Sequence, residues 1–111
     1  NVVTVDVVAQ DVPPVAVAKA ATAALNGTPQ SSQKSITVFP NQIFWLDGSD
    51  SFSPNNFDNI FWHWDLGNGA SVDGPFPSYA YSQPGVYTIT LTVTDDDKSS
   101  ATDTVQVTVT P

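Results

Sequence analysis

The sequence predicts an all-β domain, an antiparallel β-sandwich of about seven short strands. Apolar and polar residues alternate with a period of two in several segments, most regularly in 86–94 and 102–109. This alternation is typical of strands with one buried and one solvated face. Clusters of turn-forming residues separate these segments at spacings that suit a sandwich. No segment shows the 3.6-residue periodicity of an amphipathic helix.

The first three expected strands cover 14–19, 35–39 and 42–47. Residues 20–35 contain one large apolar residue, Leu25, so we expect a surface insertion there, with 18–25 as a loop or at most one helical turn. In 42–47, Phe44 and Leu46 share one face and are expected in the core. The opposite parity directs Ile43 and Trp45 outward.

The fourth expected strand, 59–66, divides clearly into two faces. Its large apolar residues of one parity are expected in the core, the two tryptophans above all: Ile60, Trp62, Trp64 and Leu66. Phe61 and His63 have the opposite parity and are expected on the solvent-facing side.

The last three expected strands cover 77–82, 86–94 and 102–109. Threonines occupy the outward parity of 86–94, and valines the inward parity of 102–109. Both residue types favour a pleated strand with one solvated face.

Residues 13–111 are expected to form the domain, with 1–12 as a linker or the end of an upstream module. Residues 2–7, which are followed by a proline pair, are similar in sequence to residues 104–109, which are followed by Pro111. This similarity indicates a tandem array of such domains. The alternative is that the first residues form an additional edge strand of this domain.

Composition excludes several classes of function. The 111 residues include eleven acids, all aspartate, and three lysines with no arginine, which gives a formal net charge of −8. Without a basic patch, binding to nucleic acid or to an anionic membrane is not expected. No apolar run approaches the ~20 residues of a membrane span. The absence of cysteine excludes disulfides, cysteine-based zinc sites and thiol nucleophiles, and a 41% apolar content argues against disorder.

Three segments carry a recognisable motif. Residues 64–69, 79–81 and 83–95 are WDLGNG, YAY and QPGVYTITLTVTD. They resemble the PKD (polycystic kidney disease) domain family, whose signature is W-D-F-G-D-G, then H-x-Y, then P-G-x-Y-x-V-x-L-x-V-x-D. LDGS at 46–49 and PVA at 14–16 extend the resemblance to about residues 12–110.

The sequence departs from the family pattern at four places. Leu66 replaces Phe, Asn68 replaces Asp and Tyr79 replaces His, and each keeps the physical role of the residue it replaces. The loop 51–58 is one residue longer than the family's acidic loop. It has Ser53 and Asn55 where aspartate is common.

The resemblance implies an immunoglobulin-like β-sandwich without catalytic activity, from a secreted or cell-surface protein. Such modules accompany extracellular proteases, collagenases, chitinases and cellulases. We therefore expect a monomeric accessory module of a secreted microbial hydrolase that binds an insoluble polymer, such as collagen or chitin, or contacts neighbouring domains. The alternative is a structural or adhesive module of a cell-surface or surface-layer protein without polymer specificity. One histidine, no cysteine and no paired nucleophile argue against an enzyme.

Three outward-facing residues are candidates for polymer binding: Trp45, Phe61 and Ile43. Large exposed apolar neighbours mark binding surfaces, and an indole ring can stack on sugar rings or on proline-rich collagen. The alternative is that Trp45 covers the insertion 20–35 or the linker.

The resemblance also implies a calcium site, because PKD-like modules of collagenases bind Ca²⁺ near the linker. Calcium takes six to eight oxygen ligands, and three loops are expected near one end of the sandwich. The candidate ligands are Asp11, Asn55, Asp58, Asp95 and Asp97, with Asp96 beside them. The alternative is ordinary turn chemistry.

Four further residues are expected to be structural. Asp47 and Asp65, at strand ends, are predicted to cap turns. Tyr87 resembles the tyrosine that ties a sandwich corner to nearby backbone, and Tyr81 is expected beneath the same turn.

Overall fold

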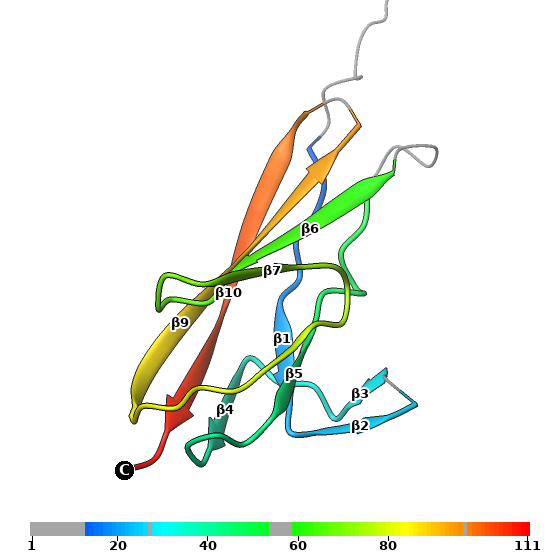
Figure 1. The fold of residues 1–111 in the computed structure, drawn as a ribbon. Coiled ribbons are helices and arrows are strands. Elements are labelled where there is room, and N and C mark those ends of the chain that lie inside the picture. Colours follow the sequence, from blue (N-terminus) through cyan, green and yellow to red (C-terminus); the bar gives the residue numbers. More distant parts are fainter. Residues whose placement is uncertain (1–12, 27, 54–58, 97) are drawn as a thin grey trace, which may run out of the picture.

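The computed structural model describes residues 13–26, 28–53, 59–96 and 98–111 (Figure 1). Residues 1–12, predicted to be a linker or the end of an upstream module, lie outside this set. Within the described ranges every regular element is a strand. In chain order the strands are β1 (Lys19–Ala21), β2 (Ala23–Leu25), β3 (Thr28–Gln30), β4 (Ser35–Val38), β5 (Phe44–Asp47), β6 (Ile60–Asp65), β7 (Ser71–Asp73), β8 (Ser78–Tyr79), β9 (Gly85–Asp95) and β10 (Ser100–Val109).

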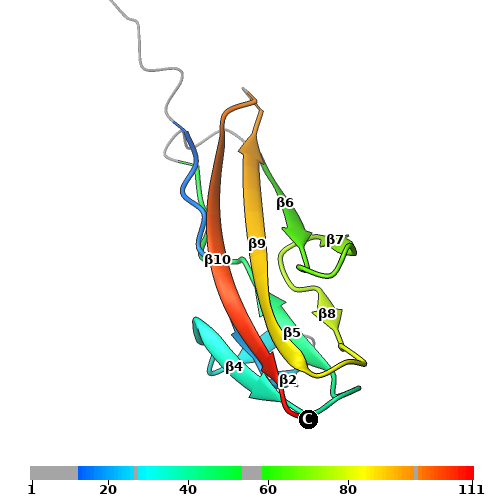
Figure 2. The ribbon, with the colours of Figure 1, turned by 90° about the vertical axis from the view of Figure 1, so that its left-hand side faces the viewer.

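The strands form two main sheets and a small hairpin. One sheet has five strands in the order β4-β10-β9-β6-β7, and the other has three in the order β1-β5-β8. The long strands β9 and β10 run side by side with β6 next to them, as Figure 2 shows. All pairs are antiparallel except β4 with β10, which is parallel. The predicted all-β sandwich is confirmed.

The core lies between the sheets and follows the predicted alternation. Phe44 and Leu46 of β5, Trp64 of β6, and Leu66 just beyond it are fully buried. The inward-facing residues of the long strands join them: Ile89, Leu91, Val93, Val105, Val107 and Val109. Trp62 is partly buried and packs against this cluster. The sequence therefore specifies which face of each long strand is buried.

The N-terminal strand differs from the expected 14–19. Its ladder with β5 begins only at Lys19. Upstream, Val15 N–H donates to the Phe52 carbonyl at 2.8 Å, and Val17 N–H donates to Ser51 Oγ at 2.9 Å. Because a side-chain oxygen takes the place of a ladder partner, this segment is extended without being a continuous strand. The periodicity of the sequence does not reveal that a side chain, and not a neighbouring backbone, accepts this hydrogen bond.

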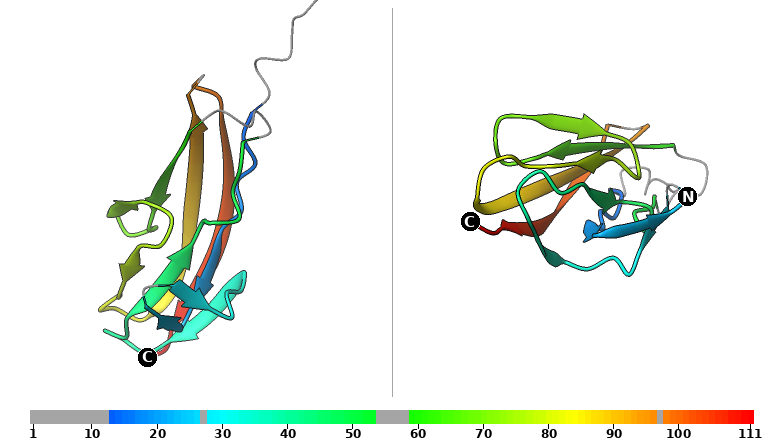
Figure 3. Two further views of the ribbon diagram at one scale, coloured as in Figure 1. Left: turned by 90° about the vertical axis from the view of Figure 1, so that its right-hand side faces the viewer. Right: turned by 60° about the horizontal axis from the view of Figure 1, so that its bottom comes forward.

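The insertion 20–35 is more ordered than expected. It contains the β2–β3 hairpin, and both of its strands contact β5 (Figure 3). The expectation of a loop or a helical turn at 18–25 is therefore wrong. Small and polar residues dominate the segment, so the hydrophobic contrast between its two faces is too weak to produce a period-two signal. β7 was missed for a related reason, since it has three residues flanked by turns.

An aromatic corner closes one end of the sandwich. The Tyr87 hydroxyl donates to the Gln83 carbonyl at 2.8 Å, and the buried Tyr81 hydroxyl donates to the Leu66 carbonyl. The two rings stack with planes 6° apart. Burial raises the pKa of Tyr81 well above its ordinary value. The predicted structural roles of both tyrosines are confirmed.

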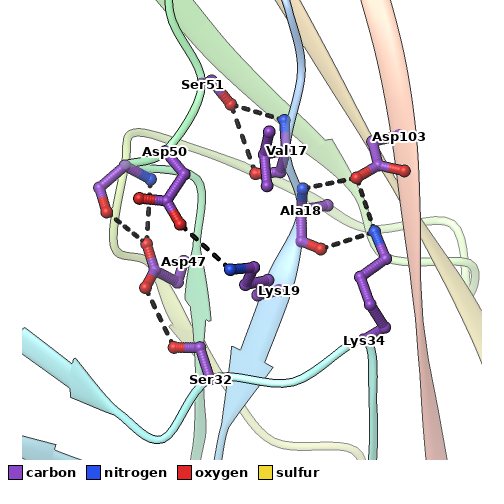
Figure 4. Close-up of polar contacts among 10 residues, drawn as sticks. Val17, Ala18, Lys19, Ser32, Lys34, Asp47, Asp50, Ser51 and Asp103 are labelled. Atoms are coloured by element: carbon purple, nitrogen blue, oxygen red, sulfur yellow. Dashed lines mark hydrogen bonds and ion pairs between the residues drawn. The ribbon is translucent and has the colours of Figure 1, made fainter.

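A polar junction ties the N-terminal segment to both sheets (Figure 4). Asp103 Oδ2 accepts hydrogen bonds from Ala18 N–H at 2.8 Å and from Lys34 Nζ at 2.6 Å. Lys34 Nζ also donates to the Ala18 carbonyl at 2.8 Å. Burial acts to raise the pKa of Asp103, but these hydrogen bonds outweigh it and hold the pKa below its ordinary value.

We expect Asp103→Asn to destabilise the domain at pH 7 by less than ~1 kcal/mol, because the ion pair is partly solvated. A carboxyl group whose pKa is lowered by folding stabilises the protein while it is ionised. That contribution is lost as the pH falls through the folded-state pKa. The difference in melting temperature between the two proteins should therefore shrink as the pH falls below about 4 and disappear once the pH lies below the lowered pKa of Asp103.

Asp50→Asn is the matched control. Asp50 pairs with Lys19 at 3.2 Å, and its side chain is 61% exposed, so little change is expected at any pH. A melting-temperature gap for Asp103→Asn that is the same at pH 7 and pH 3 would contradict the role assigned to its charge.

Candidate binding surface

The candidate surface lies on the outward face of the five-stranded sheet, around the beginning of β6. Phe61 pairs in register with Thr94 of β9, and His63 pairs with Asp73 of β7. Registered neighbours on adjacent strands project to the same face of a sheet. The Phe61 side chain is 60% exposed. The outward direction predicted for Phe61 and His63 is confirmed.

An acid–imidazole pair stands beside the aromatic ring. His63 Nδ1 lies 2.7 Å from Asp73 Oδ1, and both side chains are largely exposed. An exposed pair of this kind contributes little to folding stability. Its geometric effect is that two adjacent strands hold both polar groups at one place on the face.

A groove opens next to this pair because the chain leaves the sheet after β7. Gly74 N–H still donates to the Trp62 carbonyl at 3.2 Å, but Gly48 N–H then donates to the Pro75 carbonyl at 2.8 Å. Residues 74–75, the crossing segment, thus pass from β6 to the end of β5. The resulting hollow has a volume of about 400 Å³ and mostly apolar walls.

Two tryptophans fix the walls of this groove. Trp62 Nε1 donates to the Gly48 carbonyl, and Trp64 Nε1 donates to the Gly74 carbonyl, each at 2.8 Å. Gly74 has a φ of 106°, which L-residues with side chains rarely adopt. The crossing segment is therefore held in one conformation by buried donors.

The structure separates the predicted surface residues Ile43 and Trp45 from Phe61. Ile43 is 56% exposed just before β5, in the chain that leads into the three-stranded sheet. Trp45 is partly buried between Ala21 of β1 and Ser78 of β8, beside the β2–β3 hairpin. Trp45 and Phe61 belong to different sheets, so they do not share one sheet face.

Comparison with known proteins assigns the fold to a family. The sequence profile of the PKD domain matches residues 26–109. The chain belongs to the PKD domain family. It is similar to the PKD1 domain of the Vibrio cholerae metalloprotease PrtV (26% identity, TM-score 0.63, covering 89% of this chain and 99% of that one). It is also similar to the PKD1 domain of Vibrio anguillarum Epp (26% identity, TM-score 0.65, 91% and 98% covered).

Two further similarities are partial. The pre-pro-metalloprotease PrtV of V. cholerae is 46% identical over 39 residues, and the match covers 35% of this PKD domain but 4% of PrtV. A structure described for carbohydrate-binding modules of the β-sandwich superfamily has a TM-score of 0.73 at 21% identity, with 92% of this chain and 36% of that chain covered. This last likeness shows the fold alone. The PKD matches confirm the immunoglobulin-like sandwich.

The calcium hypothesis rests mostly on residues beyond the described ranges: Asp11, Asn55, Asp58 and Asp97. Asp95 is buried, and its Oδ1 accepts a hydrogen bond from Ser99 N–H at 3.0 Å. Asp96 Oδ2 accepts one from Asn59 N–H at 3.2 Å. In the part of the PKD domain that the structure describes, no three His, Cys, Asp or Glu side chains are grouped to hold a metal. Calcium binding stays a prediction.

Both of the predicted turn caps are present. Asp47 Oδ1 accepts hydrogen bonds from Ser49 N–H at 2.9 Å and Ser49 Oγ at 2.6 Å. Asp65 Oδ1 accepts one from Gly67 N–H at 3.1 Å. These aspartates of the PKD motif therefore cap turns, as expected.

Sequence reasoning missed Asp73 as a candidate site residue. It lies in an Asp-Gly-Pro segment, which by itself indicates a turn. Its pairing with His63 depends on the register of β7 with β6, and only the assembled sheet shows that register.

Over the described ranges, the structure contains no helix long and apolar enough to cross a membrane.

Proposed function

We propose that this domain is a non-catalytic accessory module of a secreted, multi-domain microbial hydrolase, and that it binds an insoluble polymer such as collagen or chitin. The observation that carries the proposal is Phe61, a phenyl ring 60% exposed at the rim of an apolar groove on an ordered sheet face. Exposed aromatic surface beside a preformed hollow is typical of ligand sites. The similarity to PKD1 domains of Vibrio metalloproteases supports an extracellular protease as the parent.

The polar groups beside the groove, His63 and Asp73, support a role in binding rather than in catalysis. The side chains of His63 and Asp73 are 57% and 78% exposed. Catalytic acids and bases are usually desolvated so that their pKa values suit proton transfer. An exposed pair that lines an open groove fits hydrogen bonding to a ligand better.

A co-sedimentation assay with insoluble collagen and insoluble chitin tests the proposal, run with and without millimolar Ca²⁺. We expect retention on at least one polymer, and a clear loss with Phe61→Ala, because this variant removes aromatic contact area at the groove. Val86→Ala is the control, since Val86 is 61% exposed at the far end of β9. Retention on neither polymer would overturn polymer binding.

The second candidate is a structural or adhesive module of a cell-surface protein, without polymer specificity. It is favoured by the way the chain passes through the domain. Residues 13–18 begin near the β9–β10 turn, and the C-terminus lies at the opposite end of the long strands (Figure 1). A module entered and left at opposite ends spaces its neighbours apart. Failure in the co-sedimentation assay would favour this candidate.

A further inference from the structure

We infer that the groove beside Phe61 is a binding site for an uncharged hexopyranose unit of a polysaccharide. The inference rests on the proposed function, because it names the class of polymer and the place where that polymer binds. The site is the space between the beginning of β6 and residues 73–75. Its parts are an aromatic rim, a polar pair and a fixed apolar wall.

The aromatic rim is suited to the face of a sugar ring. Phe61 stands on a sheet face that is otherwise rich in threonine, with Thr94 opposite it and Thr92 opposite His63. The apolar C–H face of a pyranose packs on an aromatic ring, which offers a large contact area with few rotatable bonds. The neighbouring hydroxyl of Thr94 can donate and accept hydrogen bonds at the same place.

The polar pair is suited to sugar hydroxyls. A carboxylate has two oxygens with about four acceptor positions, so Asp73 keeps acceptor capacity beyond the 2.7 Å contact with His63 Nδ1. The second imidazole nitrogen adds another donor or acceptor. Adjacent sugar hydroxyls both donate and accept, and this pair complements them. Since each group holds the other, less side-chain freedom is lost on binding.

The groove has the size and rigidity of a small-ligand site. Its volume of about 400 Å³ falls within the range of roughly 300–1,000 Å³ typical of ligand pockets. Ile60, Trp62 and Pro75 line its apolar side at the sheet edge, where the first residues of β6 extend beyond the part of β6 that pairs with β7. The two indole N–H bonds to Gly48 and Gly74 fix this wall before any ligand arrives.

Charge favours an uncharged ligand. A net charge of −8 opposes the approach of an anionic polysaccharide. Two of the three lysines pair with aspartates elsewhere, Lys19 with Asp50 and Lys34 with Asp103. The carboxylate in the groove is engaged by an imidazole, so it offers a cation less than a solitary carboxylate would. A hydroxyl-bearing neutral ring satisfies these groups without introducing a charge.

The test is calorimetric titration of the 111-residue chain with soluble cellohexaose and N-acetylchitohexaose. We expect at least one to bind, and Phe61→Ala and Asp73→Asn each to weaken binding about tenfold or more. Phe61→Tyr should retain binding, and Val86→Ala should leave it unchanged. Both substituted side chains are mostly exposed, so the melting temperature should stay close to that of the unchanged protein.

Several outcomes would overturn the inference. Binding that is unaffected by Phe61→Ala and Asp73→Asn would place the sugar elsewhere. Tighter binding of the cationic glucosamine hexamer or of an anionic oligogalacturonate would refute an uncharged ligand. Binding of a collagen-model peptide with no response to either neutral oligosaccharide would assign the groove to protein.

The co-sedimentation assay separates this inference from the proposed function. Retention on insoluble polymer without any binding of soluble oligosaccharide would leave the proposed function standing and overturn the sugar site. Binding of N-acetylchitohexaose at Phe61 without retention on insoluble chitin or collagen would leave the sugar site standing and overturn the proposed retention on those polymers.

Discussion

Trp64→Ala should lower the free energy of unfolding by about 3–5 kcal/mol, the range measured for truncation of large core aromatics. Trp64 is fully buried near the end of β6, paired with Leu91 of β9 and Val72 of β7. Its removal leaves a cavity between the sheets and takes away the donor that satisfies the Gly74 carbonyl. Small domains are stable by about 5–15 kcal/mol, so this is a large fraction of the total. Equilibrium denaturation by urea measures it.

Two variants control this prediction. Trp64→Phe keeps most of the buried ring and loses the hydrogen bond, so it should destabilise the domain less than Trp64→Ala does. Trp45→Ala removes the same kind of side chain from a partly buried position on the other sheet and should also cost less. A loss for Trp64→Ala no larger than that for Trp45→Ala would contradict the central role of Trp64.

The sequence predicts the core of this domain well because burial on a strand follows parity. In 59–66, two tryptophans alternate with Phe61 and His63, and the structure places the two sets on opposite faces. Along β9, the threonines of 88–94 similarly leave the inward side to apolar residues. A shift of one residue would expose every apolar side chain of such a strand, so the register is strongly specified.

The sequence does not predict contacts that depend on which strands become neighbours. The pairing of His63 with Asp73 and the junction of Lys34 with Asp103 join residues 10 and 69 positions apart. Hydrophobic alternation contains no information on these partners. The sequence therefore predicted the outward direction of Phe61 and His63 from parity, but it did not predict Asp73 or its pairing with His63.

The β2–β3 hairpin was not predicted because the two faces of its strands differ little in hydrophobicity. β2 and β3 consist of small or polar residues apart from Leu25, so their pairing leaves no period-two pattern. The hairpin nevertheless lies against β5, where Trp45 is partly buried. The sequence therefore did not reveal that a strand hairpin packs beside β5.

Gly67→Ala should destabilise the domain by about 2–5 kcal/mol, through two effects at one position. Gly67 has a φ of 77°, and an alanine there costs roughly 1–2 kcal/mol. A Cβ atom at this site would also stand 2.6 Å from the Thr88 carbonyl oxygen. Because that oxygen belongs to the backbone of β9, relief requires a shift of the turn or the strand. Overpacking of this kind costs about 1–3 kcal/mol.

Gly69→Ala is a matched control within the same turn. Gly69 also has a positive φ, 91°, but a Cβ atom there would meet nothing within 4 Å. It should therefore show the conformational cost without the clash, about 1–2 kcal/mol. The difference between the two variants in urea denaturation measures how closely this turn of the PKD motif packs on β9. Equal losses would mean that the turn moves freely away from Thr88, and that the close approach does not explain the glycine at 67.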